Sequence, residues 1–220
     1  MDLRQAIKER HSVRQYKDLP LRSGDIEHFE ALIKEYNAES GLNIQLICDD
    51  PDCFNTFLAH YGKFTNANNY FAMVGNKSLK NLDELVGYYG QKLVLEAQML
   101  GLNTCWVAGT YGKGKCKADL EAGEKIVCVI SLGYGMNNGS VHRSKPVQKL
   151  CKVPEEQMPL WFKDGLEAAL LAPTAVNQQK FRIFLENGNP VIKAKSGPMT
   201  KIDLGIVKYN FEAASGYKCK

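Results

Sequence analysis

Residues 79–100 constrain the fold of this chain most strongly, because they predict one long helix that is apolar on most of its sides. A single helical stripe carries Leu82, Leu85, Val86, Tyr89, Leu93, Ala97 and Leu100. Off that stripe lie Tyr88, Val94, Leu95 and Met99. A helix with apolar side chains on several sides is buried rather than amphipathic. We therefore expect this helix to occupy the centre of the fold.

Strand-length apolar runs stand on both sides of that helix in the sequence. They are 42–48 ("LNIQLIC") and 70–75 ("YFAMVG") before it, and 124–135 ("EKIVCVISLGYG") after it. The last run is apolar without interruption, as expected for a strand covered on both faces of its sheet. Residues 101–112 ("GLNTCWVAGTYG") predict a helix stop, a short buried strand and a glycine-rich loop, and an irregular or helical connection is expected around 54–64.

Shorter helices and a hairpin are predicted in the rest of the chain. The helices cover about 3–7, 23–36, 160–170 and 201–214. Ser23 can cap the second of them, and Pro173 requires the third to end before it. Asn187-Gly188 between two alternating runs is a hairpin signal. The final residues, "GYKCK", are expected to be loose.

The order of these elements contains a weak internal repeat. Helix, strand, strand and long helix occur over about 23–100 and again over about 158–214. Two such α+β half-domains, about 1–150 and 151–220, would form one unit in which they pack around a pseudo-twofold axis. Their shared interface is then a natural place for a ligand.

Composition and charge exclude several classes of protein. No apolar run approaches the roughly 20 residues that span a bilayer, and the first residues lack the apolar core of a secretory signal, so a cytoplasmic protein is expected. The seven cysteines show no CxxC spacing, which favours reduced thiols and gives no sign of a metal site. The net charge of +4 comes from dispersed basic residues. It fits an anionic small molecule better than a nucleic acid.

The segment "RHSVR" is the first candidate binding motif. Arg10, Ser12 and Arg14 share one side if the backbone is extended. Two guanidinium groups and a hydroxyl suit a phosphate, because arginine binds its oxygens in pairs. A solvated basic loop after a helix explains the same five residues, and the pattern alone does not decide.

Three further segments carry ligand-binding chemistry, although each also has an ordinary structural explanation. Residues 170–181 ("LLAPTAVNQQKF") end a helix and then offer amides that can read the imide edge of a heterocycle, or simply cap the helix. In 106–112, Gly109 permits close approach of a ligand to the backbone. In 131–150, Arg143 and Lys145 follow a strand end at alternating spacing.

Taken in order, these segments resemble the FMN-dependent nitroreductase family. The resemblance depends on "RHSVRQY" near the start, "GLNTCWVAGTYG" after the long helix, and "SLGYG" followed by "RSKP". The counterpart of the family's early Ala-Pro-Ser-Ala-x-Asn segment comes late here, at 172–179. In ordinary members that segment reaches the flavin from the second subunit of a dimer. The chain therefore looks like the single-chain, tandem-half branch, the TM nitroreductase type.

The resemblance implies a fold, a site and a reaction. The fold is α+β and nitroreductase-like, a central and mostly antiparallel sheet flanked by helices, with two half-size repeats forming a pseudo-dimer. The residues implied in cofactor binding are Arg10, His11, Ser12, Arg14, Val107, Ala108, Gly109, Thr110, Arg143, Lys145, Pro173, Thr174, Ala175 and Asn177. The cations would hold the FMN phosphate, and the 107–110 segment would follow the ring with a backbone N–H near N5. Whether His11 and Gln179 touch the flavin is open.

The implied activity is FMN-dependent transfer of hydride from NAD(P)H, in ping-pong order, to electron-poor acceptors such as nitroaromatics or quinones. No catalytic side chain is needed, because the flavin carries the chemistry. The partners are small molecules, with neither nucleic acid nor membrane, and the chain is a monomeric pseudo-dimer or a homodimer. A flavin-binding carrier or sensor without turnover is the alternative. A nucleic-acid or protein-interaction module would not account for the "GLNTCW" and "APTA" segments.

Overall fold

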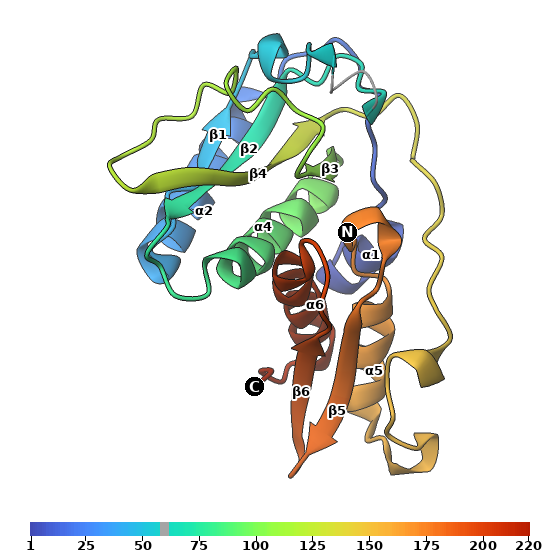
Figure 1. Cartoon of the computed structure of the whole chain (residues 1–220). Helices are drawn as coiled ribbons and strands as arrows, with labels where there is room; N and C mark the ends of the chain where they lie inside the picture. The colour runs from blue at the N-terminus through green and yellow to red at the C-terminus, as the bar shows by residue number, and fades with distance from the viewer. Residues whose placement is uncertain (58–61) are drawn as a thin grey trace. The chain divides into compact units, whose positions relative to one another are not determined.

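The computed structural model describes residues 1–57 and 62–220 (Figure 1). Contacts group the chain into two compact units. The hairpin unit comprises residues 1–10, 83–95 and 141–220, and the sheet unit comprises residues 11–82 and 96–140. Each unit is therefore assembled from segments that lie far apart in the sequence. Among the described residues, none of the helices has both the length and the apolar character to cross a membrane.

A four-stranded antiparallel sheet forms the sheet unit (Figure 1). Its strands are β1 (Gln45–Ile47), β2 (Asn69–Asn76), β3 (Asn103–Val107) and β4 (Glu124–Gly133), in the spatial order β1-β2-β4-β3. β4 pairs with β2 along one edge and with β3 along the other. A register shift between Met73 and Val74 introduces a bulge into the β2–β4 ladder.

Both faces of the sheet are covered, which explains why β2 and β4 are apolar without alternation. Phe71 of β2 meets Phe29 of helix α2 (Ser23–Ser40) edge to face, with ring centroids 5.1 Å apart. The preceding side chain, Tyr70, points to the opposite face, where its ring lies 5.8 Å from that of Phe54. All residues of β2 but the last are buried. Burial on both faces removes the polar alternation of a half-exposed strand.

Helix α4 (Leu82–Met99) is the long buried helix predicted from the sequence, and each of its residues is buried or half-buried. In the hairpin unit it crosses helix α6 (Thr200–Ser215) with the two backbones in contact. A Cβ added at Gly87 would lie 2.0 Å from the carbonyl oxygen of Ile202. A Cβ added at Gly205 would lie 2.0 Å from the carbonyl oxygen of Glu84. Glycine is therefore required on both helices at this crossing.

The rest of the hairpin unit surrounds α6. Its other elements are α1 (Leu3–Glu9), α5 (Leu160–Leu170), β5 (Phe181–Glu186) and β6 (Asn189–Ala194). Phe162 of α5 packs edge to face on Phe211 of α6, with ring centroids 5.5 Å apart. β5 and β6 form an antiparallel hairpin, and both turn residues, Asn187 (φ 51°) and Gly188 (φ 75°), adopt the left-handed conformation that a tight hairpin turn needs.

The described structure also contains short 3-10 turns. They are η1 (Pro51–Cys53), η2 (Val147–Lys149), η3 (Glu155–Gln157) and η4 (Ala175–Asn177). The prediction of an irregular or helical connection over 54–64 falls partly on residues 58–61, which lie outside the described residues.

The fold class is confirmed: the chain is α+β, with an antiparallel sheet flanked by helices. The order helix, strand, strand, helix also occurs twice, as α2-β1-β2-α4 and as α5-β5-β6-α6. The pseudo-twofold relation and the half-domains 1–150 and 151–220 stay predictions. The strand predicted over 42–48 is shorter in the structure, where β1 covers Gln45–Ile47. Residues 42–44 are held by single hydrogen bonds, such as the bond from Asn43 N to Val74 O (3.0 Å), and not by a ladder.

The prediction of a loose C-terminal tail is wrong. Tyr217 stacks on Trp161 of α5 with ring centroids 4.0 Å apart. The ammonium group of Lys218 lies 2.7 Å from the carboxylate of Glu212. These tertiary contacts fix the tail, and nothing in the local composition of "GYKCK" indicates them.

Candidate functional site

The arginine motif follows directly on helix α1. The helix ends at Glu9 and is capped by Arg10, whose backbone N–H donates to the carbonyl of Ala6 (2.9 Å) and whose own backbone is extended. Ser12 then forms a parallel bridge with Thr104 of β3, and Val13 N donates to Thr104 O (3.0 Å). The backbone is therefore extended, which is the condition for Arg10, Ser12 and Arg14 to share a side.

Burial differs along this motif. Arg10 belongs to the hairpin unit and is 5% exposed, whereas Ser12 is half-buried and Arg14 is exposed, both in the sheet unit. The guanidinium of Arg14 is thus available to an anion in solution. Convergence of all three side chains stays a prediction.

Tyr16, the aromatic residue at the end of "RHSVRQY", anchors this segment to the sheet. It is fully buried, and its hydroxyl donates to Val13 O (2.6 Å) and lies 2.7 Å from Ser131 Oγ of β4. Burial raises the pKa of Tyr16 far above its usual value, so the hydroxyl stays protonated. Its ring leaves no space beside Gly133, where an added Cβ would lie 2.9 Å from the ring. The motif's tyrosine is therefore structural.

The loop after β4 packs against the arginine motif. Met136 N donates to Gln15 O (2.9 Å), and the amide of Asn137 donates to Gln15 Oε1 (3.0 Å). Gly139 has a φ of 70°, and a Cβ there would lie 2.7 Å from Ser12 O and 2.9 Å from His11 Cβ. The "RHSVRQY" and "SLGYG" segments of the sequence are therefore neighbours in space.

The segment 107–110 leaves β3 and becomes accessible. Val107 is buried as the last residue of the strand, whereas Ala108 and Gly109 are exposed and Thr110 is half-buried. No described heavy atom lies within 4 Å of the position that a Cβ at Gly109 would occupy. The protein itself does not require glycine there. Open space before an exposed backbone fits a flat ligand that approaches it closely.

In the hairpin unit, two segments that the sequence analysis singled out separately are bonded together. We call 143–145 the basic strap and 173–179 the strained segment. The side-chain amides of Asn177 and Gln179 both donate to Arg143 O, at 2.9 and 3.0 Å. Lys145 N donates to Gln179 Oε1 (2.7 Å), and Lys145 Nζ donates to Gln178 O (2.5 Å). The two cations are thereby held beside the amide-bearing segment.

These contacts define the role of Gln179. It is 3% exposed, and its amide also donates to Asn177 Oδ1 (2.7 Å). The side chain of Gln179 is therefore engaged inside the protein. Asn177 is exposed and keeps one amide hydrogen beyond those contacts, so its predicted cofactor contact stays a prediction.

The strained segment takes its name from its backbone. Val176, Asn177 and Gln179 have φ values of 45°, 53° and 44°, in the left-handed region that non-glycine residues avoid. For the β-branched Val176 this conformation is a true outlier, and its side chain is 97% exposed. Such strain persists only where surrounding contacts impose it, and it is concentrated at ligand-binding segments.

Asp203 of α6 imposes part of that conformation. The carboxylate is 3% exposed, and it accepts hydrogen bonds from Ala175 N (2.8 Å) and from the side-chain amide of Gln178 (2.7 Å). Burial raises the pKa of Asp203, and the two hydrogen bonds oppose that rise. No motif in the sequence singles out this residue. Its only indication in the sequence is that this acidic residue stands within the otherwise apolar stretch 202–207.

Comparison with known proteins identifies the family. The family model described as "Putative TM nitroreductase" matches residues 2–215, which is nearly the whole chain. The chain belongs to this nitroreductase family.

Solved structures share the nitroreductase fold. A "putative nitroreductase" from Thermotoga maritima superposes with a TM-score of 0.70 at 20% identity, covering 97% of this chain and 83% of that one. A "putative nitroreductase in complex with FMN" from Desulfovibrio desulfuricans gives 0.53 at 21% identity, covering 72% of this chain and 99% of that one. A protein from Bacteroides thetaiotaomicron, described as a putative NADH dehydrogenase/NAD(P)H nitroreductase, gives 0.53 at 17%, covering 67% and 95%. Among curated protein sequences, none matches.

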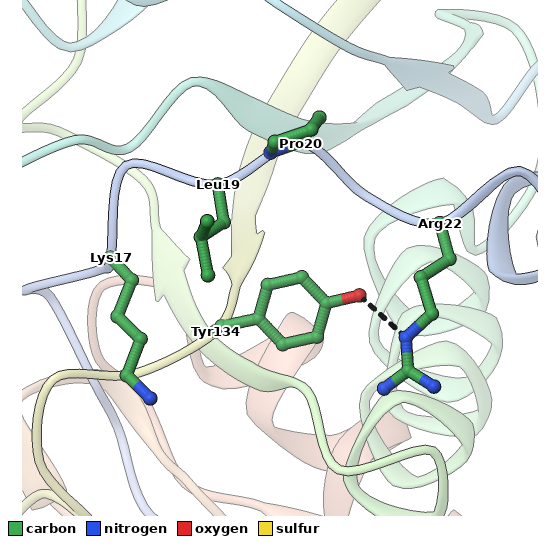
Figure 2. A pocket seen from close by; sticks show the side chains of 5 residues that line it. All are labelled: Lys17, Leu19, Pro20, Arg22 and Tyr134. Carbon is green, nitrogen blue, oxygen red and sulfur yellow. Dashed lines mark hydrogen bonds between the residues drawn. The ribbon is translucent and has the colours of Figure 1, made fainter.

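A surface hollow of the nitroreductase chain lies beside the "SLGYG" segment (Figure 2). Its volume is about 400 Å³, and it is lined by Lys17, Leu19, Pro20, Arg22 and Tyr134. Arg22 Nε donates to the hydroxyl of Tyr134 (3.2 Å), and the guanidinium carbon lies 5.7 Å from the centre of that ring. None of the fourteen predicted cofactor residues lines this hollow.

The structure therefore groups the predicted residues in two sets. In the sheet unit, His11, Ser12 and Arg14 run beside β3, whose end leads into 107–110. In the hairpin unit, the basic strap holds Arg143 and Lys145 on the strained segment, which contains Pro173, Thr174, Ala175 and Asn177. That both sets bind one cofactor stays a prediction.

Proposed function

We propose that this nitroreductase-family protein is an oxidoreductase that binds FMN, accepts electrons from NAD(P)H and reduces electron-poor small molecules such as nitroaromatics or quinones. The observation that carries the proposal is the attachment of the basic strap to the strained segment through Asn177 and Gln179. Family membership gives the reaction class, and this attachment supplies the cation-plus-amide chemistry that a flavin phosphate and ribityl chain require.

The phosphate of FMN would be held by cations and a hydroxyl. Arg14 and Arg143 are exposed, and Ser12 is half-buried beside β3. Lys145 Nζ uses one donor on Gln178 O and keeps two for an anion. Arg10 would complete this set. A phosphate dianion gains charge-assisted hydrogen bonds from such groups, and arginine adds paired geometry.

The ring system would lie along backbone rather than along charged side chains. Open space at Gly109 leaves the backbone of 107–110 accessible to a flat ring. Pro173, Thr174, Ala175 and Asn177 would contact the ring or the ribityl chain. When bound, the flavin would supply the hydride and electron chemistry, and the 107–110 backbone would orient it and offer it a hydrogen bond. We propose a ping-pong mechanism, in which NAD(P)H and the acceptor bind in turn at the same face of the flavin.

Two relatives support this proposal through their descriptions. One structure was solved in complex with FMN, and the description of another names NAD(P)H. We further propose that a single polypeptide, as a monomeric pseudo-dimer or in a homodimer, supplies all the contacts to FMN.

The direct test is spectroscopic. The purified full-length protein is mixed with excess FMN, freed of unbound FMN by gel filtration, and its absorbance is recorded before and after NADH or NADPH is added without air. We expect a retained flavin spectrum that bleaches with at least one nucleotide and returns when a quinone or nitroaromatic is added. A retained but unbleached flavin would contradict the enzyme and favour a carrier, and a colourless protein would contradict both.

A further inference from the structure

Two cysteines of the sheet unit, Cys53 and Cys116, are not among the proposed cofactor residues. Cys53 ends the η1 turn and is fully buried, whereas Cys116 lies in the loop that precedes β4 and is half-buried. Cys53 belongs to the buried cluster of the sheet unit, and Cys116 packs against that cluster. The two residues are far apart in the sequence, and no CxxC spacing indicates that they form a pair.

The backbone holds the two thiols in place. Gly112 N donates to Cys53 O (2.7 Å), and Cys116 N donates back to Gly112 O (3.1 Å). A Cβ at Gly112 would lie 2.6 Å from Thr56, so the loop passes close to the turn that carries Cys53. The local fold therefore holds the two cysteines as neighbours, because the backbone of each bonds to Gly112.

A polar network surrounds the pair within an otherwise apolar core. Tyr70 donates its hydroxyl hydrogen to the fully buried carboxylate of Asp50 (2.5 Å) and accepts from Lys117 N (3.1 Å). The ammonium of Lys117 lies 3.3 Å from the same carboxylate. Buried polar groups of this kind fix the position of what they touch.

The two thiols differ in acidity. The hydrogen bond from Cys53 lowers the pKa of Cys116 more than burial raises it, and Tyr70 and the N–H of Ala118 add to the lowering. The same hydrogen bond, together with burial, raises the pKa of Cys53. A thiolate at the more accessible position beside a protonated thiol is the arrangement of a reactive cysteine with a resolving partner.

We propose that Cys116 and Cys53 form a peroxide-responsive pair that closes to a reversible disulfide. The Cys116 thiolate attacks a hydroperoxide: an S–O bond forms, the O–O bond breaks, and the released oxygen leaves as water or an alcohol after taking up a proton. Cys53 then attacks the sulfenic sulfur: an S–S bond forms, the S–O bond breaks, and water leaves. The two thiols supply both electrons. Two equivalents of a thiol, or one dithiol, restore them by exchange.

The decisive experiment maps thiols in the full-length protein. Reduced protein is treated with equimolar hydrogen peroxide, alkylated, digested and analysed by mass spectrometry. We expect a Cys53–Cys116 linked peptide, free thiols falling from seven to five, and full recovery on reduction. Cys116 found free, or linked to another cysteine, would overturn the proposal. Disulfide formation in the unaltered protein does not require FMN binding. Failure of this proposal can therefore be distinguished from failure of the proposed function.

Variants test the order of the two steps. Cys53→Ala should retain a sulfenic acid at Cys116 that dimedone traps, with at least roughly ten times more label than any other cysteine. Cys116→Ala should abolish peroxide-dependent loss of the Cys53 thiol. Cys48→Ala, at a half-buried thiol outside the pair, should form the linked peptide like the wild type. Circular dichroism confirms folding of each variant, and equal dimedone labelling of all remaining thiols would contradict the assignment of Cys116 as the reactive group.

Discussion

The carboxylate of Asp203 accepts a hydrogen bond from the backbone N–H of Ala175 at 2.8 Å and so fixes the start of a turn whose next two residues are left-handed. Its second oxygen accepts from Gln178, whose amide also donates to Pro198 O (2.8 Å). One buried acid thus sets the conformation of the segment that we propose to contact FMN. Asp203 itself is not predicted to contact the cofactor.

Replacing Asp203 should weaken FMN binding and stability together. Asp203→Ala leaves the N–H of the half-buried Ala175 without its acceptor, at a cost of about 1–3 kcal/mol in the free energy of unfolding. Asp203→Asn keeps one acceptor oxygen and should lose less. Urea unfolding and FMN titration measure the two effects. Glu186→Ala, which removes an exposed ion pair with Lys193, is the control and should change stability by less than about 1 kcal/mol. Equal effects of Asp203→Ala and the control would contradict the positioning role.

Stability should depend on pH through the same residue. The folded-state pKa of Asp203 is raised by burial, so the folded protein binds its proton more tightly than the unfolded chain does. The resulting stabilisation is fully present below the ordinary aspartate pKa of about 3.9 and is lost as pH rises through the raised value. Measured by urea unfolding, wild type should lose stability relative to Asp203→Asn as pH rises through that window. A difference independent of pH would contradict the prediction.

Gly109→Ala should separate ligand binding from folding. No described atom would touch the new methyl group, so the free energy of unfolding should change by less than about 0.5 kcal/mol. The same methyl group would stand between the backbone and a closely packed ring, so FMN affinity should fall roughly tenfold or more. Thermal unfolding without FMN and fluorescence titration with FMN make the comparison. Unchanged affinity would remove 107–110 from the proposed site.

The helix crossing in the hairpin unit gives a test of packing alone. Gly87→Ala places a Cβ 2.0 Å from the carbonyl oxygen of Ile202, so it should destabilise the protein by about 1–3 kcal/mol even though alanine is the better helix former. Gly24→Ala in α2 is the matched control, because no described atom lies within 4 Å of its Cβ. That variant should gain about 0.5–1 kcal/mol. The same sign for both variants in urea unfolding would contradict the crossing.

The elements predicted from the sequence are those whose signals are local. Apolar periodicity predicted α4 and α5, and Asn187-Gly188 predicted the hairpin because its turn requires two left-handed residues. The tail was mispredicted because what holds it, the stacking of Tyr217 on Trp161, joins residues far apart in the sequence.

In the candidate site too, local signals in the sequence indicate some features and tertiary contacts determine the others. Residue chemistry singled out the basic strap and the strained segment, but only tertiary structure shows that Asn177 bonds to Arg143. Asp203 was missed because an acid on a helix is usually solvated, and its buried partners come from a different segment. Sequence patterns therefore indicated which groups take part, and the fold shows how they are held.

We propose that both residue sets, one in each unit, bind the same FMN. Titration of the apoprotein with FMN in wild type, Arg14→Ala and Asn177→Ala tests this, with Lys8→Ala, a change of an exposed cation, as the control. We predict that wild type binds one FMN per chain and that the control binds it with the same dissociation constant. In Arg14→Ala the dissociation constant should rise roughly ten- to hundredfold, as expected for loss of a charge-assisted hydrogen bond of about 1.5–3 kcal/mol. In Asn177→Ala it should rise at least several-fold. Wild-type affinity in either Arg14→Ala or Asn177→Ala would contradict the claim.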